Sequence, residues 1–325
     1  MKYTIVVLIV VTLCACFSSK KNVPNYAEQL STKALPVPAE ADMLAPVTTD
    51  EPKVEKPQPF SRIISNGTYY DVTDLFDLFD YIGDTSLKSL RINNGIFSDL
   101  SPLAALTELE DLRIAYTRNV VDISPLSSLA NLRKLELFEL SPSFQDITPL
   151  SSLSNLRYLR TSGPFDCNFR GFASLPQLEV LSIGHSCIDV SHIARLTTLR
   201  ELYLEGYGKI VNIEHLQNLK NLKGLSIYGE ENGNLDLSWI PALQELEYLH
   251  MPRQIIADIS PLALLPRLVE INLYLARVEN IEVLLESKSI KEVSNFRALD
   301  DGELEYRLSL QFWERGISFY SFVGN

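Results

Sequence analysis

Leucine-like residues recur along most of the chain in one spaced pattern, L-x-x-L-x-L. The ten units begin at Leu87, Leu109, Leu132, Leu156, Leu178, Leu199, Leu222, Leu246, Leu268 and, in a weaker form, Ile290. Successive units start 21 to 24 residues apart, and of the thirty patterned positions only Thr161 and Asn295 are not Leu, Ile, Val or Met. Self-similarity at such a period is the signature of a stacked-repeat fold. Residues 87–296 are therefore predicted to form a solenoid.

A second phrase recurs between these units. Copies run from Asp99 to Leu103, Asp122 to Leu126, Asp146 to Leu150 and Asp258 to Leu262, each reading Asp, apolar, Ser or Thr, Pro, Leu. Ser or Thr before Pro favours the start of a helix, because the hydroxyl can cap it and Pro suits the first helical position. Each unit is thus predicted to be a short strand, a turn and about one 3₁₀ turn.

The combined phrase D-I-S-P-L-x-x-L-x-N-L-x-x-L-x-L, as in Asp122 to Leu137, resembles the 22-residue class of bacterial leucine-rich repeats found in internalin-like proteins. The resemblance implies a right-handed α/β solenoid, with a parallel β-sheet on its concave face and short 3₁₀ or irregular segments on its convex face. It also implies protein binding. In this class an Asn usually follows the strand, whereas Gly95, Thr117 and Leu140 stand there in the first three units. An irregular turn after each strand is therefore expected.

Both open ends of the solenoid need a cover, because each repeat buries its apolar face only against a neighbour. Residues 60–86 are predicted to form an N-terminal cap, with a hairpin at Asn66-Gly67 and a helix over 73–82. Residues 297–325 are predicted to form a C-terminal cap, with a helix from Glu303 to Arg315 and a strand from Ile317 to Phe322.

The first residues are typical of an export signal. A basic start and an apolar run precede Leu13-Cys14-Ala15-Cys16, which resembles a bacterial lipobox with Cys16 as the lipidated residue. Residues 1–15 are thus predicted to be a lipoprotein signal peptide; an ordinary signal peptide cut nearby and an uncleaved anchor are the alternatives. Residues 16–59 are rich in Pro and predicted to be a disordered tether. Phe17 and Ser18 after the lipobox favour anchoring to the outer membrane of a bacterial envelope, facing the periplasm or the surface.

Charge and motifs exclude several classes of protein. The net charge of −12 argues against nucleic-acid binding, which would need a basic stripe. The sequence contains no phosphate loop, nucleophile elbow or metalloprotease helix. We therefore expect neither catalysis nor a cofactor, and contact with a membrane only through the lipid anchor.

His, Asp and Cys residues in the turns could form metal sites or a disulfide, but each also has a simpler interpretation. His185 with Cys187 has weak metal-site spacing, and His192 and His215 occupy the slot of Pro in other repeats, as tolerated solvent-facing substitutions. The recurring Asp is expected to bind backbone N–H groups of its own turn; calcium is the alternative. Cys167 and Cys187 fall in adjacent turns, so an exported chain permits a disulfide between them. Two free buried thiols are the alternative.

Strand alternation separates buried from exposed positions of each unit. Positions 1, 4 and 6 point inward, and positions 3, 5 and 7 lie on the exposed sheet surface. The predicted binding residues there are Arg91, Arg113, Arg160, Tyr203, Tyr228, Tyr248, His250, Tyr274 and Phe296. Arg and aromatic residues are enriched at interfaces, although aromatics also simply suit strands. The prediction is a monomeric, non-enzymatic module that binds an extended protein partner in adhesion or envelope interaction; the alternative is a structural scaffold in an envelope complex.

Overall fold

The computed structural model describes residues 69–72, 86–93, 97–141, 143, 146–163, 169, 172, 174–185, 187–206, 209–228, 234–294 and 302–320. All of these residues belong to one compact unit, Lys56–Asn325. The predicted signal peptide, lipobox and tether lie outside the described residues. Among the described residues, no helix has both the length and the apolar character needed to cross a membrane.

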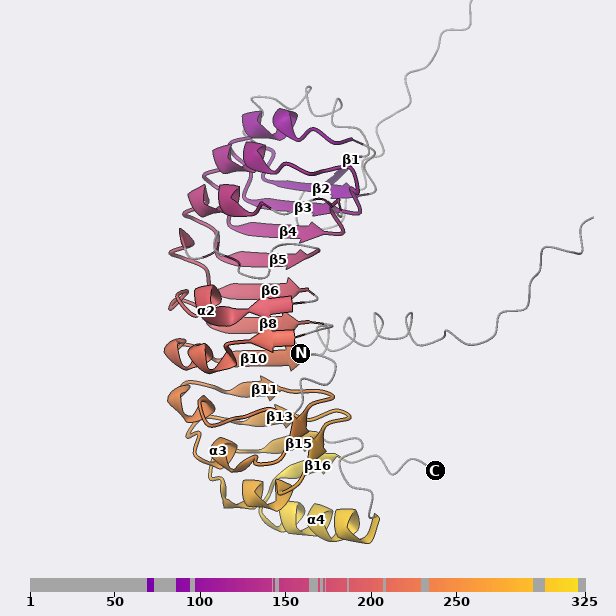
Figure 1. Cartoon of the computed structure of the whole chain (residues 1–325), viewed down its shortest axis with the longest axis vertical. Helices are drawn as coiled ribbons and strands as arrows, with labels where there is room; N and C mark the ends of the chain where they lie inside the picture. The colour runs from indigo at the N-terminus through magenta and orange to yellow at the C-terminus, as the bar shows by residue number, and fades with distance from the viewer. Residues whose placement is uncertain are drawn as a thin grey trace, which may run out of the picture. The chain divides into compact units, whose positions relative to one another are not determined.

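The main feature of this unit is a sheet of twelve parallel strands that follow one another in sequence order. Figure 1 shows them stacked as successive rungs, with the short helical segments to one side. The strands are β1 (Tyr69–Val72), β2 (Ser89–Asn93), β3 (Asp111–Ala115), β4 (Lys134–Phe138), β5 (Tyr158–Ser162), β6 (Val180–Gly184), β8 (Glu201–Glu205), β10 (Gly224–Tyr228), β11 (Tyr248–His250), β13 (Glu270–Asn272), β15 (Glu292–Ser294) and β16 (Ser318–Tyr320). The predicted parallel sheet is confirmed.

The core lies between this sheet and the helical segments. Position 4 of each unit stacks on position 4 of the next, so that Leu112 is in register with Leu90 and Leu135. Leu225, at position 4 of a central unit, is only 3% exposed. Thr161, which interrupts the apolar pattern at position 6 of β5, is buried as well. The predicted inward positions 1, 4 and 6 are therefore confirmed in the described units.

Short helical segments return the chain from one strand to the next. The 3₁₀ segments are η2 (Ser101–Ala105), η3 (Ser124–Ser128), η4 (Thr148–Ser152), η6 (Ile213–Asn218), η7 (Ile240–Ala242) and η8 (Ile281–Glu286), and two coils carry single α-helical turns, α2 (Val190–Ile193) and α3 (Ser260–Ala263). The expected capping by the Ser or Thr hydroxyl is wrong. Instead the preceding Asp carboxylate accepts the Ser or Thr N–H, as in Ser124 N to Asp122 Oδ1 at 2.7 Å.

The turns after the strands are less irregular than expected. Strand β7 (Cys187–Asp189) pairs in parallel with β9 (Lys209–Val211), and β12 (Ile255–Ile256) pairs with β14 (Arg277–Val278). In these two places the turns of adjacent coils are therefore held together by backbone hydrogen bonds between short parallel strands. Ile188, Ile256 and Val278 from these small sheets are buried and extend the core.

The ends of the solenoid carry further elements. β1 pairs in parallel with β2 and adds a rung, while the predicted hairpin turn and the helix over 73–82 lie outside the described residues. At the other end, the predicted helix and strand are confirmed as α4 (Gly302–Glu314) and β16. Phe312 of α4 stacks on Phe319 of β16 with ring centroids 4.8 Å apart. This contact joins the helix to the last rung of the sheet.

Candidate protein-binding face

The outward side of the main sheet carries positions 3, 5 and 7 of each unit, and we call it the binding face. Its central column is formed by position 5, whose residues stand in direct register on neighbouring strands. From β2 to β15 these residues are Arg91, Arg113, Glu136, Arg160, Ser182, Tyr203, Ser226, His250, Asn272 and Ser294. Side chains more than twenty residues apart in sequence therefore touch across the rungs.

The first part of the binding face, over β2 to β5, is rich in charge, and we call it the charged half. Phe138 on β4 lies between two guanidinium groups, those of Arg113 and Arg160, each 5.2 Å from the ring centroid. Cation–π contacts of this kind favour Arg on an aromatic face. Arg113 also pairs with Glu136 at 3.3 Å, and Arg160 with Glu205 at 3.5 Å. Both arginines thus contact a ring and a carboxylate.

Lys134 connects the charges of this half. Its ammonium lies 3.1 Å from Glu136, 3.6 Å from Asp111 and 5.5 Å from the centre of the Tyr158 ring. Burial alone would lower the pKa of Lys134, but the carboxylates of Glu136 and Asp111 outweigh it and raise that pKa. Burial also raises the pKa of Asp111, with a smaller contribution from Glu136. The charged side chains of this half therefore form one connected network of ion pairs and ring contacts.

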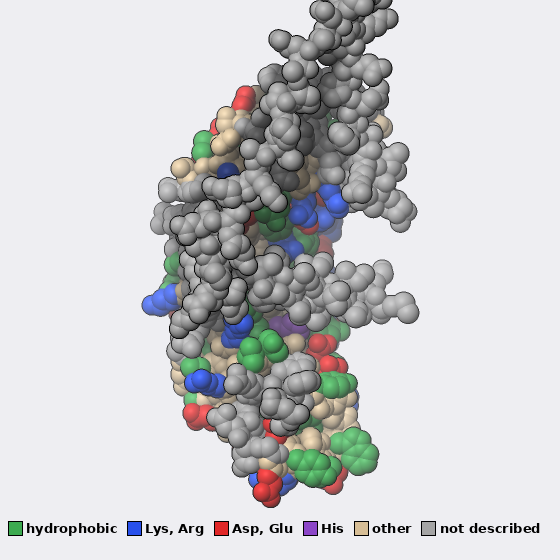
Figure 2. Space-filling model, turned by 90° about the vertical axis from the view of Figure 1, so that its right-hand side faces the viewer, with side chains coloured by type: hydrophobic (Ala, Val, Ile, Leu, Met, Phe, Trp, Pro, Cys, Tyr) green, Lys and Arg blue, Asp and Glu red, His purple; other side chains and the backbone are tan. Residues whose placement is uncertain are grey.

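The second part, from β8 to β13 and Tyr274 two residues after it, is richer in exposed aromatic rings, and we call it the aromatic half. Tyr248 is 37% exposed and Tyr274 is 44% exposed, whereas Tyr203 and Tyr228 are half-buried. The Arg253 guanidinium lies 5.8 Å from the Tyr228 ring centroid. Figure 2 shows Lys and Arg side chains clustered in the upper part of one side of the molecule, and large hydrophobic side chains near its lower end.

Two polar contacts hold side chains of the aromatic half in place. The Tyr203 hydroxyl donates to Glu201 Oε2 at 2.7 Å, and burial together with this bond raises the pKa of Tyr203 well above its ordinary range. His250 Nε2 lies 3.6 Å from Glu270 Oε1, and this contact with His250 lowers the pKa of Glu270. Tyr203 is therefore a neutral hydrogen-bond donor at physiological pH.

The predicted site residues are found where strand alternation placed them. Seven of them lie on the outward side of their strands: Arg91, Arg113, Arg160, Tyr203, Tyr228, Tyr248 and His250. Tyr274 is the second residue after β13. Phe296 lies outside the described residues. Strand alternation also places Phe138 on this face, but it was not among the predicted binding residues. Its position 7, beside the position-5 arginines of both neighbouring strands, identifies it as their common contact. The binding role of these residues stays a prediction.

The sites weighed for metals and a disulfide have other contacts. His185 is buried, and its Nδ1 lies 3.0 Å from the Cys187 nitrogen and 2.7 Å from the Cys187 oxygen. Cys187 is half-buried and has no disulfide with a described residue. Cys167 lies outside the described residues, so a bond between the two stays a prediction for thiol titration. His192 and His215 are half-buried on the helical side. In the described part of the chain, no three His, Cys, Asp or Glu residues are grouped to hold a metal.

The recurring Asp residues act within their own turns, as predicted. Asp99, Asp146, Asp236 and Asp258 each accept the N–H two residues on at 2.8 to 2.9 Å. Hydrogen bonds from Ser101 and Thr148 lower the pKa of Asp99 and Asp146. Asp189 also accepts from Asn212 of the next coil at 2.9 Å. These carboxylates are hydrogen-bond acceptors for the turns.

Comparison with known proteins supports the fold. No protein-family model matches the sequence, and no curated protein matches it either. An internalin from Listeria monocytogenes is similar in structure, with a TM-score of 0.52 and 24% identity over 74% of this chain and 76% of that one. The fold is a leucine-rich-repeat solenoid. A chain of the mouse RP105/MD-1 complex has a TM-score of 0.52 and 19% identity, over 75% of this chain and 47% of its own.

Proposed function

We propose that this leucine-rich-repeat solenoid is a non-enzymatic protein-binding module that holds an extended segment of a partner on its binding face. The exposure of Tyr248 and Tyr274 carries the proposal. Neither ring is needed in the core, and exposed aromatic rings on a rigid surface are the common anchors of protein interfaces. The parallel strands repeat about every 4.8 Å, so neighbouring rungs can contact successive residues of an extended chain.

Two features support the two halves acting together on one partner. The aromatic half offers rings to apolar side chains, while the charged half offers guanidinium groups that are already oriented by Phe138, Glu136 and Glu205. Preorganised side chains lose less conformational freedom on binding. The similar solved structures include a chain that is part of a protein complex, the mouse RP105/MD-1 complex, which favours a protein partner here as well.

We also propose that the module is carried by an exported bacterial lipoprotein, anchored through Cys16 to the outer membrane and acting in adhesion or envelope interaction. The lipobox Leu13 to Cys16 and the Pro-rich segment up to residue 59 support this proposal. Fatty-acid labelling in cells tests it. The wild-type chain is expected to incorporate a clickable fatty acid and Cys16→Ala is not; equal labelling of the two would exclude this anchor.

The binding proposal is tested by capture of protein from an envelope extract on the immobilised full chain. Tyr228→Ala and Tyr274→Ala are expected to lose the captured partner and to keep the unfolding midpoint of the wild type. His192→Ala and His215→Ala, half-buried on the helical side, are the matched controls and are expected to capture normally. Normal capture by both tyrosine variants would contradict the proposal.

A structural scaffold within an envelope complex is the second candidate, and one observation favours it. Helix α4 exposes Tyr306, Leu310 and Trp313 by 67%, 44% and 76%. Spacings of four and three residues place these side chains on one helix face, and a contiguous exposed apolar patch is typical of a contact surface. In the same capture experiment, Trp313→Ala separates the two functions: loss of capture with Trp313→Ala alone would favour the scaffold.

A further inference from the structure

A second charged surface lies at the edge where the strands begin, and we call it the leading edge. It is formed by position 2 of the units: Lys88, Glu110, Arg133, Arg157, Glu179, Arg200, Lys223, Glu247, Val269 and Lys291. Six of these residues are cations and three are acids, although the whole chain carries a net charge of −12. The leading edge is therefore a basic strip on an acidic protein.

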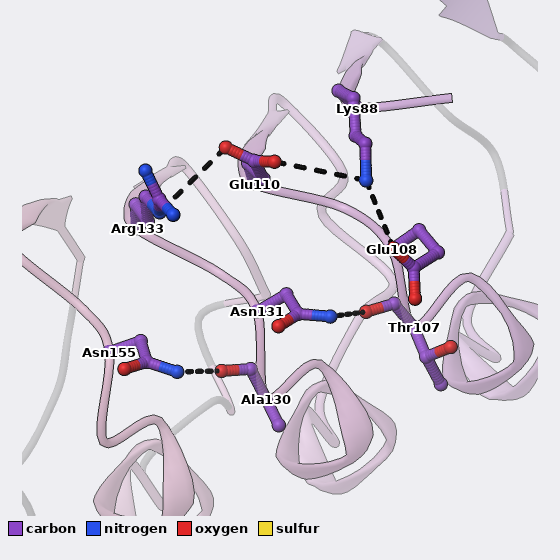
Figure 3. A network of polar contacts seen from close by, with 8 residues as sticks. All are labelled: Lys88, Thr107, Glu108, Glu110, Ala130, Asn131, Arg133 and Asn155. Atoms are coloured by element: carbon purple, nitrogen blue, oxygen red, sulfur yellow. Dashed lines mark hydrogen bonds and ion pairs between the residues drawn. The ribbon is translucent and has the colours of Figure 1, made fainter. Parts of the chain in front are cut away.

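Backbone and amide hydrogen bonds hold the leading edge in a fixed spacing. Each position-2 nitrogen donates to the position-2 oxygen of the preceding coil, as in Arg200 N to Glu179 O at 2.8 Å. The Asn131 and Asn155 side chains donate to Thr107 O and Ala130 O of the preceding coils at 3.0 and 2.8 Å (Figure 3). The charged side chains thus stand on a rigid backbone ladder.

One acid is shared between two cations in two places along this strip. Glu110 lies 3.8 Å from Lys88 and 3.7 Å from Arg133, contacts that Figure 3 shows. Glu179 lies 2.6 Å from Arg157 and 3.9 Å from Arg200. In the first trio Lys88 also pairs with Glu108 at 3.0 Å, so its charges balance, whereas the second trio keeps one unneutralised positive charge. The cations are 45%, 65%, 56% and 60% exposed in the order given.

The second trio differs from the first because it borders a groove. The groove has a volume of about 820 Å³ and crosses five successive coils. Its charged lining consists of Arg157, Glu179, Arg200, Lys220, Lys223 and Glu245, and its amide lining of Gln177, Asn221 and Gln244. Two of these residues have partners outside the groove: Glu245 is paired with Arg267, and Lys223 with Glu247 at 2.8 Å. Of the rest, Arg157, Arg200 and Lys220 face the single acid Glu179. The groove therefore holds more positive than negative charge.

We propose that this groove binds an acidic, extended peptide segment of a partner protein. The strands of Arg157 and Lys223 are three rungs apart, about 14 Å, which an extended peptide spans with about four residues. Guanidinium groups fit carboxylates with two parallel hydrogen bonds, and the amide side chains offer donors and acceptors to a peptide backbone. None of the described side chains that line the groove is aromatic, which disfavours ligands that bind by ring stacking.

The test measures binding of a fluorescein-labelled peptide of about six glutamates to the full chain by anisotropy, with the glutamine version as the probe for charge. The glutamate peptide is expected to bind at low salt and weaken with added salt, and the glutamine peptide to bind at least about tenfold more weakly. Equal binding of the two peptides would overturn the proposal.

Matched variants then locate the site. Arg157→Gln with Arg200→Gln should weaken binding by about tenfold or more, because both cations around Glu179 are lost. Lys88→Gln with Arg133→Gln removes the same charge around Glu110, away from the groove, and should change binding less than about twofold. Equal weakening by both double variants would mean that the peptide is attracted by the overall positive charge of the leading edge, and it would overturn the groove as the binding site. Thermal melting checks that both double variants are folded.

One further substitution acts in the opposite direction. Glu179→Gln removes the acid that competes for Arg157 and Arg200, so it should tighten binding of the glutamate peptide by several-fold. Glu110→Gln, its counterpart away from the groove, should have little effect. Tyr274 lies on the binding face, so Tyr274→Ala should leave binding of the glutamate peptide unchanged. The peptide titration therefore tests the groove, and partner capture tests the proposed function, independently of each other.

Discussion

The charged half and the aromatic half of the binding face are built from the same repeat unit, with a parallel strand and buried residues at positions 1, 4 and 6. They differ in what their outward side chains contact. In the charged half, Arg113 and Arg160 each contact both Phe138 and a carboxylate. In the aromatic half, Tyr248 and Tyr274 are more than a third exposed. The guanidinium groups of one half are therefore already engaged by neighbouring side chains, and the other half leaves apolar area for a partner.

This difference separates two uses of a repeated surface. A paired network fixes side-chain geometry but must exchange its internal contacts for those with a partner, which limits the gain in affinity. Exposed rings gain apolar burial without breaking an ion pair. We therefore expect the aromatic half to provide most of the affinity and the charged half to set orientation and selectivity.

The largest expected effect is on stability and concerns the leucine core, in which the two halves do not differ. Leu225→Ala in the aromatic half and Leu135→Ala in the charged half should each lower the free energy of unfolding by about 2–5 kcal/mol, because both side chains are buried at position 4. Chemical denaturation measures this loss. Lys223→Ala, which removes an ion pair with Glu247 and has a side chain 41% exposed, should cost less than about 1 kcal/mol. A loss below about 1 kcal/mol at either leucine would contradict the register.

The second effect concerns binding and distinguishes the halves directly. Tyr248→Ala should weaken partner capture by about 2 kcal/mol, roughly thirtyfold, while leaving stability close to wild type. Arg91→Ala in the charged half should cost less than about 1 kcal/mol in the same titration, with a change in salt dependence. If the arginine variant loses more affinity than the tyrosine variant, the assignment of the two halves is reversed.

Local periodicity was enough to predict which residues face inward and which face outward. It placed Leu225 in the core and Tyr248 on the surface. The recurring phrase also predicted that the Asp122 carboxylate accepts a backbone N–H of its own turn. Contacts between coils were harder, since they depend on how units of unequal length stack. Asn131 was visible in the repeat phrase, but its acceptor, Thr107 O, lies 24 residues earlier. The groove at the leading edge likewise joins five coils, so no single unit predicts it.

The third effect lies in β5, at the end of the charged half. Thr161 is 2% exposed, stands in register between Leu137 and Ile183, and its hydroxyl has no hydrogen-bond partner among the described residues. Thr161→Val keeps the shape and removes the unpaired group, so it should raise the free energy of unfolding by about 1 kcal/mol. Thr148→Val is the control, because its hydroxyl donates to Asp146, and it should not stabilise. A destabilised Thr161→Val would indicate a partner for that hydroxyl.

The smallest effect is a pH dependence of opposite sign in the two halves. The pKa of Glu270 in the aromatic half is lowered by its contact with His250, so its ionised form stabilises the fold. This contribution is present above the unfolded pKa of about 4.3 and is lost as pH falls through the lower folded pKa. The pKa of Asp111 in the charged half is raised by burial, so its ionised form costs stability at neutral pH. That cost is relieved as pH falls through the raised folded pKa towards about 3.9.

Matched substitutions expose these opposite signs. Glu270→Gln should lower the free energy of unfolding at pH 7 by less than about 1 kcal/mol, and its difference from wild type should vanish at acid pH. Asp111→Asn replaces a carboxylate whose neutral form is favoured, so it should be neutral or slightly stabilising at pH 7. Its advantage should shrink as pH falls towards 4, because the wild-type carboxyl then becomes neutral too. Denaturant unfolding at several pH values measures both differences, and differences of the same sign for the two variants would contradict the contrast between the halves.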